Sequence, residues 1–497
     1  MNRRAISILA VLAMLCTMFT FAMPATAEAT ELALNFPKYA DHANHPDQKE
    51  WLIQDAADWK AMMATADATA VGEEYFSGHT FHLTADVDFS QTEWLPPMGE
   101  GRYFGGTING HGFGFNELKI YEGDGVFDAS YNHKDAEGTG MFQRLGNCTF
   151  IDFGVNSGCV HRATGGVRTS VTTFGSLKNG YKPTFTRVWS GMELRHVNTG
   201  SVSALAVPAD AAYNEDITVN GYVFDGKIST NRRNAFSLIG CIEGETRVIT
   251  GGLKLTNIIT DAQMYTNTRS PQHPQLNGEN SLAAGAVSAP GETIATAYYS
   301  SLFSSNANTQ MNEAIVENIY TVSYPNVVSY FGRGGDTRTI DKRMVTESAL
   351  EAAWTANKNP SQSAAEPVFF TLKNGKIRPT AESKNMIVKV TLTGIKDKVY
   401  YLNANTTYDL AETFGKNDQQ TFKINAETVT ALVLGSEDVT IEVTTDCTHN
   451  GYTVTEGENA NEHIRRCAIC GYDKVETCSA QQNCTVNAIT EEQLAAG

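Results

Sequence analysis

The sequence predicts an all-β protein: a right-handed parallel β-helix with capping helices, followed by a small β-sandwich and a small Cys/His metal-knuckle tail. Three observations lead to this prediction. Short runs rich in Phe, Ile, Val and Thr are separated by Gly, Asn and Asp every few residues, most clearly over residues 103–160. Helical periodicity is absent over long stretches of the chain. Five of the nine cysteines crowd into the segment 447–484.

Residues 1–27 have the pattern of a secretory signal peptide. Arg3 and Arg4 precede an apolar stretch, and Ala25-Thr26-Ala27 offers a cleavage site of small residues. The apolar stretch is short for a membrane span and has the wrong flanks, so we expect no membrane span after signal removal. A retained anchor is the alternative. The mature protein is expected to be secreted or at the cell surface, with residues 28–50 as a flexible leader.

The chain is acidic, with 55 Asp and Glu against 38 Lys and Arg and a formal net charge of −17. This balance argues against nucleic acid and anionic lipid as partners, because both are themselves negatively charged. It suits an extracellular protein whose partner is a glycan or another protein.

The β-helix is predicted over residues 51–383. A strand at 51–53 leads into a helix over 55–63, which Asp55 can cap and which would cover the open end of the first turn. The apolar face of this helix consists of Trp59, Met62 and Met63. Strand alternation follows over 79–89, with inward positions at Phe81, Leu83, Ala85, Val87 and Phe89.

A series of motifs in residues 51–160 carries a family resemblance. In order, they are Leu83-Thr84-Ala85-Asp86-Val87-Asp88, Trp94 with Pro97 and Gly99, Phe104 to Gly112, and Gly140-Met141-Phe142. This order and spacing resemble bacterial secreted or cell-surface β-helix proteins with GLUG-type repeats. The resemblance implies an architecture and is a poor guide to function.

Looser self-similar segments follow at 140–160, 173–202, 235–264 and 301–323. Between them, 203–234 and 265–300 are interpreted as insertions that project from one side, where binding loops usually lie.

The end of the β-helix is predicted from two local elements. A helix over 344–357 has a Ser348/Glu351 capping box and carries Leu350 and Trp354 on one face. A terminal strand follows over 369–379.

Residues 384–445 alternate strongly and predict the small β-sandwich, with Val429, Ala431 and Val433 among the alternating apolar positions.

The tail module, residues 446–497, has the spacing of a metal knuckle. Cys467-x-x-Cys470 is followed by Gly, and Cys447-x-His449 precedes it. Zinc takes four such ligands in a tetrahedron, and so short and polar a segment needs a staple to fold. We expect one structural zinc on Cys447, His449, Cys467 and Cys470, with His463 and Cys478 as reserve ligands. One or two disulfides are the alternative, since the compartment is oxidising.

The tail also resembles a small Cys/His module found near the ends of secreted proteins of Gram-positive bacteria. Cys447, His449, His463, Cys467, Cys470 and Cys478 occupy the matching positions. The resemblance implies a Gram-positive-type bacterial source.

Asp86, Asp88 and Glu93 are the best carboxylates for a glycan-cleaving or glycan-eliminating enzyme. However, Asp in such a strand–turn sequence usually caps backbone N–H groups, so a structural role is favoured and no catalytic residue is assigned.

Other reactive residue types receive structural interpretations. His79 and His82 have odd separation and would face opposite sides of a strand, so surface or turn roles are favoured over a metal site for them and for His111. Cys148 and Cys159 either bridge adjacent turns or sit buried as small apolar residues, and burial is favoured.

The function that follows is that of an exported, non-catalytic, adhesin-like interaction protein. It would bind a host or microbial glycan or protein through the β-helix face and its inserted loops, because a rigid solenoid leaves a continuous outer face for recognition. Two alternatives stay open: an extracellular polysaccharide lyase or glycoside hydrolase, and a structural stalk or scaffold.

Overall fold

A computed structural model describes most of the chain after residue 32. The described ranges are 33–122, 138–163, 170–196, 201–208, 212–230, 234–239, 248–249, 252–261, 263–266, 299–303, 315–322, 345–346, 348–360, 366–394, 397–415, 420–445, 447, 451–457, 462–468 and 473–477. Two compact units result, one within Glu31–Ile387 and the other within Val388–Gly497. The signal peptide expected over 1–27 lies outside the described residues.

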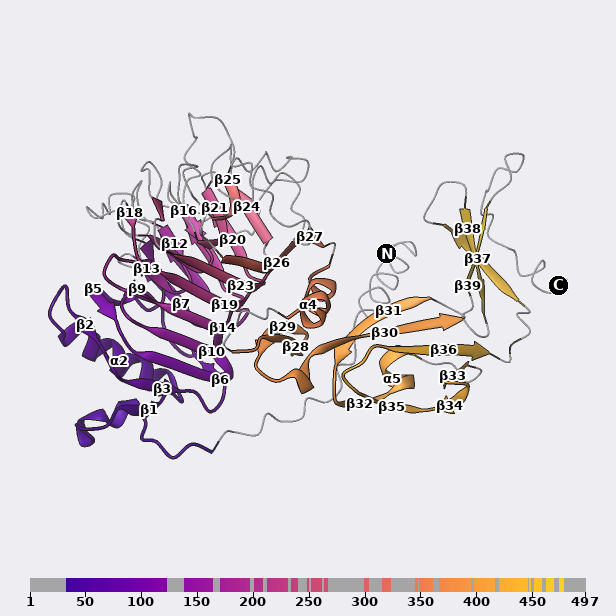
Figure 1. Ribbon diagram of the computed structural model, residues 1–497, viewed down its shortest axis with the longest axis horizontal. Helices are drawn as coiled ribbons and strands as arrows, with labels where there is room; N and C mark the ends of the chain where they lie inside the picture. Colours follow the sequence, from indigo (N-terminus) through magenta and orange to yellow (C-terminus); the bar gives the residue numbers. More distant parts are fainter. Residues whose placement is uncertain are drawn as a thin grey trace, which may run out of the picture. The chain divides into compact units, whose positions relative to one another are not determined.

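The described chain is mostly β, and the sheets of its first unit are parallel apart from one terminal hairpin, as the sequence predicts at this level (Figure 1). The largest is the main sheet. In order across it, the strands are β1 (Glu50–Leu52), β3 (Thr80–His82), β6 (Thr107–Asn116), β10 (Thr149–Val155), β14 (Thr184–Ser190), β19 (Ile217–Phe224), β23 (Leu253–Thr260), β26 (Ile315–Val322) and β27 (Val345–Thr346), with β4 (Val87–Asp88) beside β6.

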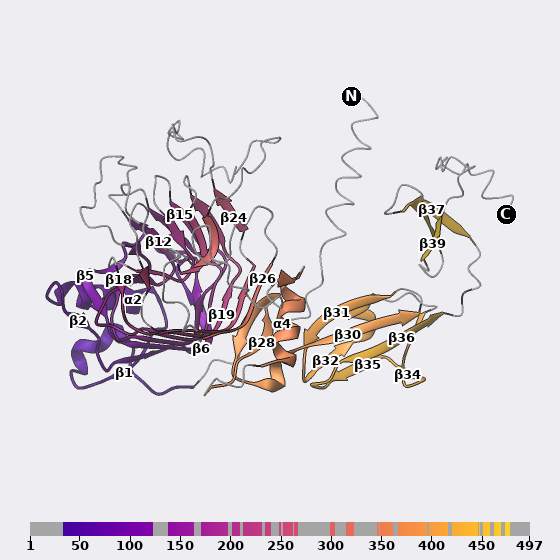
Figure 2. The same cartoon turned by 45° about the horizontal axis from the view of Figure 1, so that its top comes forward.

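Two further sheets complete the first unit, and Figure 2 shows strands of both lying across the interior from the main sheet. The side sheet has the order β24 (Gln263–Thr266), β20 (Lys227–Thr230), β15 (Glu193–His196), β11 (Val160–Ala163) and β7 (Lys119–Glu122). The third sheet contains β2 (Glu74–Tyr75), β5 (Met98–Phe104), β9 (Phe142–Leu145), β13 (Gly175–Leu177), β17 (Ala206–Pro208), β21 (Asn234–Ile239), β16 (Ser201–Ser203), β12 (Ser170–Thr172), β8 (Gly138–Thr139) and β25 (Tyr299–Phe303). Beside them, β18 (Ala212–Tyr213) pairs with β22 (Val248–Ile249).

The chain visits these three sheets repeatedly in one order, from the main sheet to the side sheet to the third sheet and back. Residues that lie opposite each other on the successive strands β10, β14, β19 and β23 are 34 to 36 positions apart in the sequence. The interpretation of 203–234 as an insertion is therefore wrong. That segment supplies β17 to β20, including the central strand β19, and is a full turn of the repeat. Most of 265–300 lies outside the described residues.

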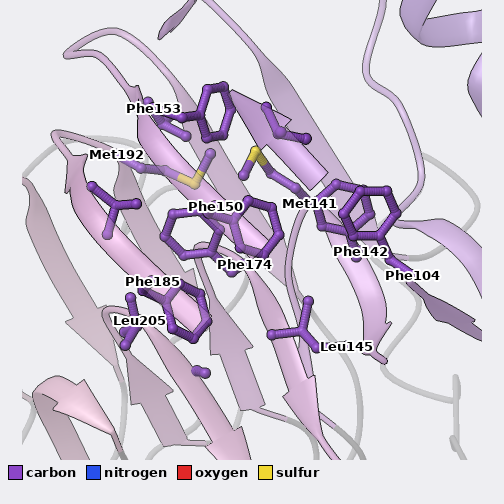
Figure 3. Close-up of a cluster of buried hydrophobic side chains, with 14 of the residues drawn as sticks. Phe104, Met141, Phe142, Leu145, Phe150, Phe153, Phe174, Phe185, Met192 and Leu205 are labelled. Atoms are coloured by element: carbon purple, nitrogen blue, oxygen red, sulfur yellow. The ribbon is translucent and has the colours of Figure 1, made fainter. Parts of the chain in front are cut away.

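Apolar side chains stack in register inside the three sheets (Figure 3). On the main sheet Ile108, Phe150, Phe185, Val219 and Leu255 lie opposite one another on consecutive strands, and all are fully buried. Burial of each side chain of this size contributes about 1.5–3 kcal/mol to the free energy of folding, and this burial stabilises a chain of short strands. Because equivalent residues stack, the core continues from one turn to the next.

Each long strand of the main sheet bends at one residue with a left-handed backbone. These residues are Asp152, Arg187, Gly221, Asn257 and Asn318, with φ of 47°, 51°, 84°, 58° and 51°. In β6 the bend contains His111 (φ 51°) and Gly112 (φ 84°). Non-glycine residues rarely adopt this conformation, and Asn and Asp do so most readily. We call this series the bend column.

Helix α2 (Ala56–Ala68) covers the first turn, as the sequence predicts for the segment from Asp55 onward. Asp55 accepts hydrogen bonds from the N–H groups of Ala57 and Asp58, and Asp58 completes a capping box. Trp59 is buried against the rings of Phe115 and Phe142.

Two expectations for residues 28–89 are modified. A 3-10 helix, η1 (Tyr39–Asn44), lies within the expected leader and buries Tyr39. The strand expected over 79–89 is interrupted between β3 and β4, so Ala85 is exposed instead of inward.

Helix α4 (Ala349–Lys358) is shorter than predicted and presents a different face. Ser348 makes no side-chain cap, so the expected capping box is absent, and β27 occupies the start of the predicted helix. The helix buries Ala352, Ala353, Ala356 and Asn357, whereas Leu350 and Trp354 are only partly buried. Small residues allow α4 to lie close against β23 and β26.

The terminal strand predicted over 369–379 is an antiparallel hairpin, β28 (Phe369–Lys373) and β29 (Lys376–Thr380). Its turn is Asn374-Gly375, with φ of 53° and 71°. Asn357 ties the hairpin to α4, because its amide accepts from Phe370 N at 2.8 Å and donates to Phe370 O at 3.0 Å. A short 3-10 helix, η4 (Ser383–Asn385), follows.

The second unit contains a five-stranded sheet in the order β31 (Lys398–Asn403), β30 (Ile387–Gly394), β36 (Val439–Thr445), β33 (Gln420–Ile424) and β34 (Glu427–Val429). A two-stranded sheet of β32 (Thr406–Asp409) and β35 (Ala431–Leu434), the helix α5 (Leu410–Phe414), and a meander of β37 (Tyr452–Glu456), β38 (Glu462–Cys467) and β39 (Asp473–Thr477) complete it.

The predicted alternation at the end of the small β domain has the wrong phase. Leu432 and Leu434 are buried, and Val433 is 74% exposed. The reason is a break at Thr430, where β34 has ended and β35 has not begun, so the alternation restarts one residue later.

Among the helices that the structure describes, none is long and apolar enough to cross a membrane.

Candidate functional site

The outer surface of the side sheet carries an aromatic and basic column. Register places Tyr121, Arg162 and Arg195 side by side on β7, β11 and β15. Side chains alternate along these strands, so the inward neighbours Ile120, His161 and Leu194 are buried. On the other side of these strands Arg162 and Arg195 are partly exposed, whereas Tyr121 is 7% exposed and lies beneath the Trp94 ring and Arg162. These three residues and Trp94 form a row that we call the side-sheet face.

Trp94 stands at one end of this face and is 42% exposed. Its ring meets Tyr121 edge-on, with 6.2 Å between the ring centroids, and the guanidinium of Arg162 lies 5.3 Å from the Trp94 ring centre. The next residue, Leu95, is buried and pairs with Ile120 in a parallel bridge. The backbone thus fixes the position of an indole ring that remains accessible to solvent.

Cations predominate on the side-sheet face. Lys119 and Lys227 lie at the neighbouring outward positions of β7 and β20, and Glu193 is the acidic residue in the same row. Glu193 accepts from Arg195 Nε at 2.7 Å, which holds that guanidinium in place. The chain has a net charge of −17, whereas this strip carries a local excess of positive charge.

The outer surface of the main sheet is different, because the hairpin β28–β29 covers its bend column. Lys373 donates to Gly112 O at 2.7 Å and lies 3.6 Å from Asp86. Arg378 donates to Asp225 at 3.0 Å. Burial lowers the pKa of Lys373 and of Arg378, although the neighbouring carboxylates oppose this change.

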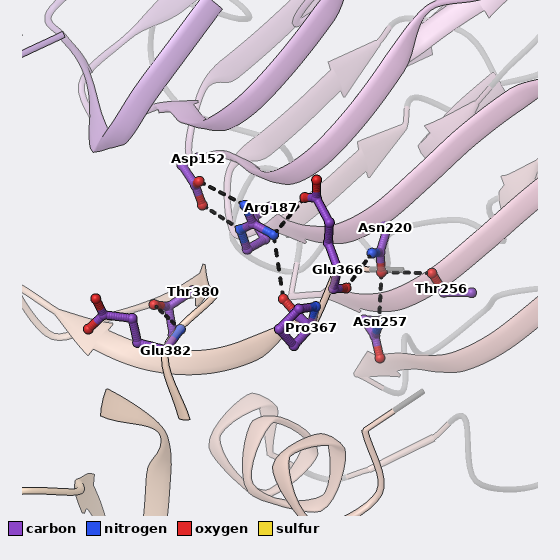
Figure 4. A network of polar contacts seen from close by, with 9 residues as sticks. All are labelled: Asp152, Arg187, Asn220, Thr256, Asn257, Glu366, Pro367, Thr380 and Glu382. Atoms are coloured by element: carbon purple, nitrogen blue, oxygen red, sulfur yellow. Dashed lines mark hydrogen bonds and ion pairs between the residues drawn. The ribbon is translucent and has the colours of Figure 1, made fainter. Parts of the chain in front are cut away.

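Arg187 is the centre of the polar contacts under the hairpin (Figure 4). It donates to both carboxylate oxygens of Asp152 and, at 3.1 Å, to Glu366. The Glu366 carbonyl accepts from Asn220 at 3.0 Å, and Asn220 accepts in turn from Asn257 at 3.0 Å. These contacts link polar side chains of four consecutive turns, on β10, β14, β19 and β23.

Of the three candidate carboxylates, Asp86 and Asp88 accept hydrogen bonds from backbone N–H groups, which is the structural role that the sequence favours. Asp86 accepts from Gly114 N at 2.8 Å. Asp88 accepts from Ser90 N and Oγ at 2.8 and 2.9 Å, an Asx-turn. Glu93 is exposed next to Trp94.

The histidines lie in two separate settings. His79 Nδ1 accepts from Trp51 Nε1 at 3.0 Å, and its Nε2 lies 2.9 Å from the Lys49 ammonium. His82 instead faces His111 of the next strand, with 2.9 Å between His82 Nδ1 and His111 Nε2. The sequence separations did not indicate this second pairing, because it depends on how many residues form one turn.

In the tail, the structure brings together two of the six candidate ligands. Cys447 Sγ and Cys467 Sγ lie 3.6 Å apart, and Cys467 is buried. His463 is on the same strand as Cys467, roughly 13 Å away for four residues of extended chain. Its Nε2 lies 3.1 Å from Glu476 on β39. His449, Cys470 and Cys478 lie outside the described residues.

Within the described ranges, no group of three or more His, Cys, Asp and Glu side chains has the geometry of a metal site. Cys148 and Cys159 are buried thiols, as the sequence favours. Cys159 Sγ donates to Phe115 O at 3.3 Å and accepts from Leu118 N at 3.2 Å. Burial raises the pKa of Cys159 to about 12.

No protein-family model, curated protein or solved structure matches the chain.

Sequence reasoning missed both the side-sheet face and the hairpin cover. The hairpin had a local signal, since Asn-Gly between alternating apolar residues favours a two-residue turn. The side-sheet face had none, because Trp94 and Arg162 are brought together only by the winding of the chain.

Proposed function

We propose that the protein is an exported, non-catalytic interaction protein of adhesin-like type that binds an extracellular glycan through the side-sheet face. The observation that supports this most directly is the exposed indole of Trp94, held between Tyr121 and Arg162. Sugar rings present apolar C–H faces and hydroxyl edges, which an aromatic ring and a guanidinium can engage together.

The scaffold for this face is a right-handed parallel β-helix in our proposal. The constant order of visits to three parallel sheets supports it, as do the stacked core residues and the bend column. Such a scaffold suits glycan binding because register fixes the outward side chains of neighbouring turns relative to one another.

The preferred glycan contains acidic sugars. Lys119, Arg162, Arg195 and Lys227 outnumber Glu193 and Glu93 on and beside this face, and guanidinium groups bind carboxylates in a bidentate manner. The overall acidity of the protein would repel such a polymer elsewhere, so binding would be restricted to this strip.

The alternative of a polysaccharide lyase or hydrolase on the main sheet has less support. The carboxylates Asp86, Asp152 and Asp225 on that side are paired with Lys373, Arg187 and Arg378. The hairpin that supplies two of these cations lies over the position where a substrate would bind.

For the tail we propose a structural zinc that includes Cys447 and Cys467. Two thiolates on one tetrahedral zinc lie roughly 3.8 Å apart, given bonds of about 2.3 Å. The 3.6 Å between these sulfurs fits that arrangement. His449, Cys470 and Cys478 stay in the proposal as further ligands, with His463 in reserve. An exported location, as expected for a Gram-positive bacterial protein, makes disulfides the competing outcome.

Binding to polygalacturonate and hyaluronan, with dextran as a neutral comparison, tests the glycan proposal in affinity electrophoresis. We expect Trp94→Ala to weaken binding about tenfold, a typical loss for an accessible aromatic contact. Arg162→Gln should weaken binding to the acidic polymers alone. Val71→Ala is the control, because Val71 is 72% exposed and lies outside the side-sheet face.

Equal binding by all variants would indicate that the glycan binds elsewhere on the protein. Failure of the wild-type protein to bind any of the three polymers would favour the stalk or scaffold alternative. Unfolding midpoints of each variant establish that the fold is retained.

A further inference from the structure

His82 and His111 place two ring nitrogens face to face on the outer surface of the main sheet. His82 Nδ1 and His111 Nε2 are 2.9 Å apart, and the two rings are stacked with 5.2 Å between centroids. The two histidines come from adjacent parallel strands, β3 and β6. At this distance one imidazole donates an N–H hydrogen bond to the other, so removal of that single proton would leave two nitrogen lone pairs close together.

Glu50 completes the arrangement from the third strand, β1. Its Oε2 lies 2.5 Å from His82 Nε2, the ring nitrogen that points away from His111. A carboxylate in this position accepts a hydrogen bond from Nε2–H, which leaves Nδ1 as the acceptor in the contact with His111 and as a potential metal ligand. Carboxylate–histidine pairs of this kind orient metal-binding imidazoles and make them better donors.

Packing fixes both rings. Phe36 stacks on His82 with 5.0 Å between centroids, and the His82 side chain is 11% exposed. His111 is held in the bend of β6 at φ 51°, where Asn109 Oδ1 accepts its backbone N–H at 3.1 Å. A strained backbone that is held by a specific hydrogen bond is a feature of positions whose side chain must point in one direction.

We propose that His82 Nδ1 and His111 Nε2 bind a single divalent transition-metal ion of the zinc or copper type. Two imidazole nitrogens on one tetrahedral metal lie roughly 3.3 Å apart, given bonds of about 2.05 Å. The observed 2.9 Å requires a movement of a few tenths of an ångström. Solvent would supply the remaining ligands, so the ion would keep open positions, and the site is independent of the side-sheet face and of the tail.

His79 provides an internal comparison in the same region. Both of its ring nitrogens face donors, Trp51 Nε1 and the Lys49 ammonium, so neither is available to a metal. We therefore expect that His79, which lies close to the same strands, does not contribute to metal binding.

The test uses full-length mature protein in which the five tail cysteines are replaced by serine, which removes the competing thiolate site. Zn²⁺ binding is measured by calorimetry and Cu²⁺ binding by electron paramagnetic resonance, whose hyperfine pattern counts nitrogen ligands. We expect one ion per chain with two nitrogen ligands. His82→Gln or His111→Gln should weaken binding at least 100-fold, Glu50→Gln should weaken it 10- to 100-fold, and His79→Gln should leave it unchanged.

Two results would overturn the proposal. One is no binding by the tail-substituted protein when its thermal unfolding matches that of the wild type. The other is equal weakening by His79→Gln and His111→Gln, which would indicate scattered surface histidines. Because glycan binding is measured separately at the side-sheet face, either result leaves that proposal untouched.

Discussion

Arg187 and Asp152 lie side by side on β14 and β10, and the Arg187 guanidinium donates two hydrogen bonds, of 2.5 and 2.9 Å, to the Asp152 carboxylate. Both residues have left-handed backbones, and the Arg187 side chain is 6% exposed. The pair joins the bends of two consecutive turns and gives the hairpin β28–β29 a charged point of attachment through Glu366.

Arg187→Met is expected to destabilise the first unit by about 3 kcal/mol, because it leaves Asp152 without its cation in a half-covered site. Urea denaturation followed by tryptophan fluorescence measures the change. Lys38→Met is the matched control, since Lys38 pairs with Asp55 but is 44% exposed. An exposed pair contributes less than about 1 kcal/mol. Equal effects of the two substitutions would contradict the importance of burial here.

Gly375→Ala is expected to lower the stability of the hairpin β28–β29 by about 1 kcal/mol, because Gly375 has φ 71° and alanine is strained there. Limited proteolysis of native protein should then cleave between β28 and β29 faster than in the wild type. Gly435→Ala serves as the control, because its added Cβ would meet nothing within 4 Å and its φ is not in the left-handed region. Unchanged cleavage in Gly375→Ala would mean that the turn does not limit opening.

Asp58 should produce an unusual pH dependence of stability. Burial raises its pKa above the ordinary value of 3.8, and the nearby Asp55 carboxylate adds to this, despite hydrogen bonds from Gln54 and Ala40. The native state then holds this proton more tightly than the unfolded chain does. As the pH rises from 3.8 through the raised pKa, the free energy of unfolding therefore loses a contribution.

The measurement is the unfolding free energy of wild type minus that of Asp58→Asn between pH 3.5 and 6. We expect this difference to decrease as the pH rises. A difference that increases would show that the hydrogen bonds to the carboxylate outweigh its burial.

Native thiol reactivity should divide the cysteines into two classes. Cys148 and Cys159 are buried with raised pKa values, so iodoacetamide at pH 8 should label neither until urea is added. Cys447 and Cys467 should become reactive after a chelator if they hold zinc, and only after a reductant if they form a disulfide. Mass spectrometry of the labelled peptides distinguishes these outcomes.

Local patterns predicted the elements whose signals lie within a few residues. Asp55 before an apolar face gave α2 and its N-cap, and Asp88 before Ser90 gave an Asx-turn. The same reasoning failed for α4, where alanines and Asn357 are buried instead of Leu350 and Trp354. There, the close approach of two strands selects the smallest side chains, and the helical pattern alone does not contain that information.

Contacts between turns could not be predicted in the same way. The pairs His82–His111 and Asp152–Arg187 join residues on neighbouring strands, and Trp94–Arg162 joins a residue outside the strands to β11. Each pair depends on the number of residues in a turn. That number varies, since β6 has additional residues at its bend relative to β10. Treating 203–234 as an insertion was an error of the same origin, because a turn with weak local signals was counted as a loop.

The bend column means that the first unit could change length by duplication. A copied segment that runs from one left-handed residue to the next, for example from Arg187 to Gly221, would bring its own bend, its own side-sheet strand and its own core layer. It would stack on its neighbours without altering them. Related chains would then differ in length by whole turns, while α2 continues to cover the first turn.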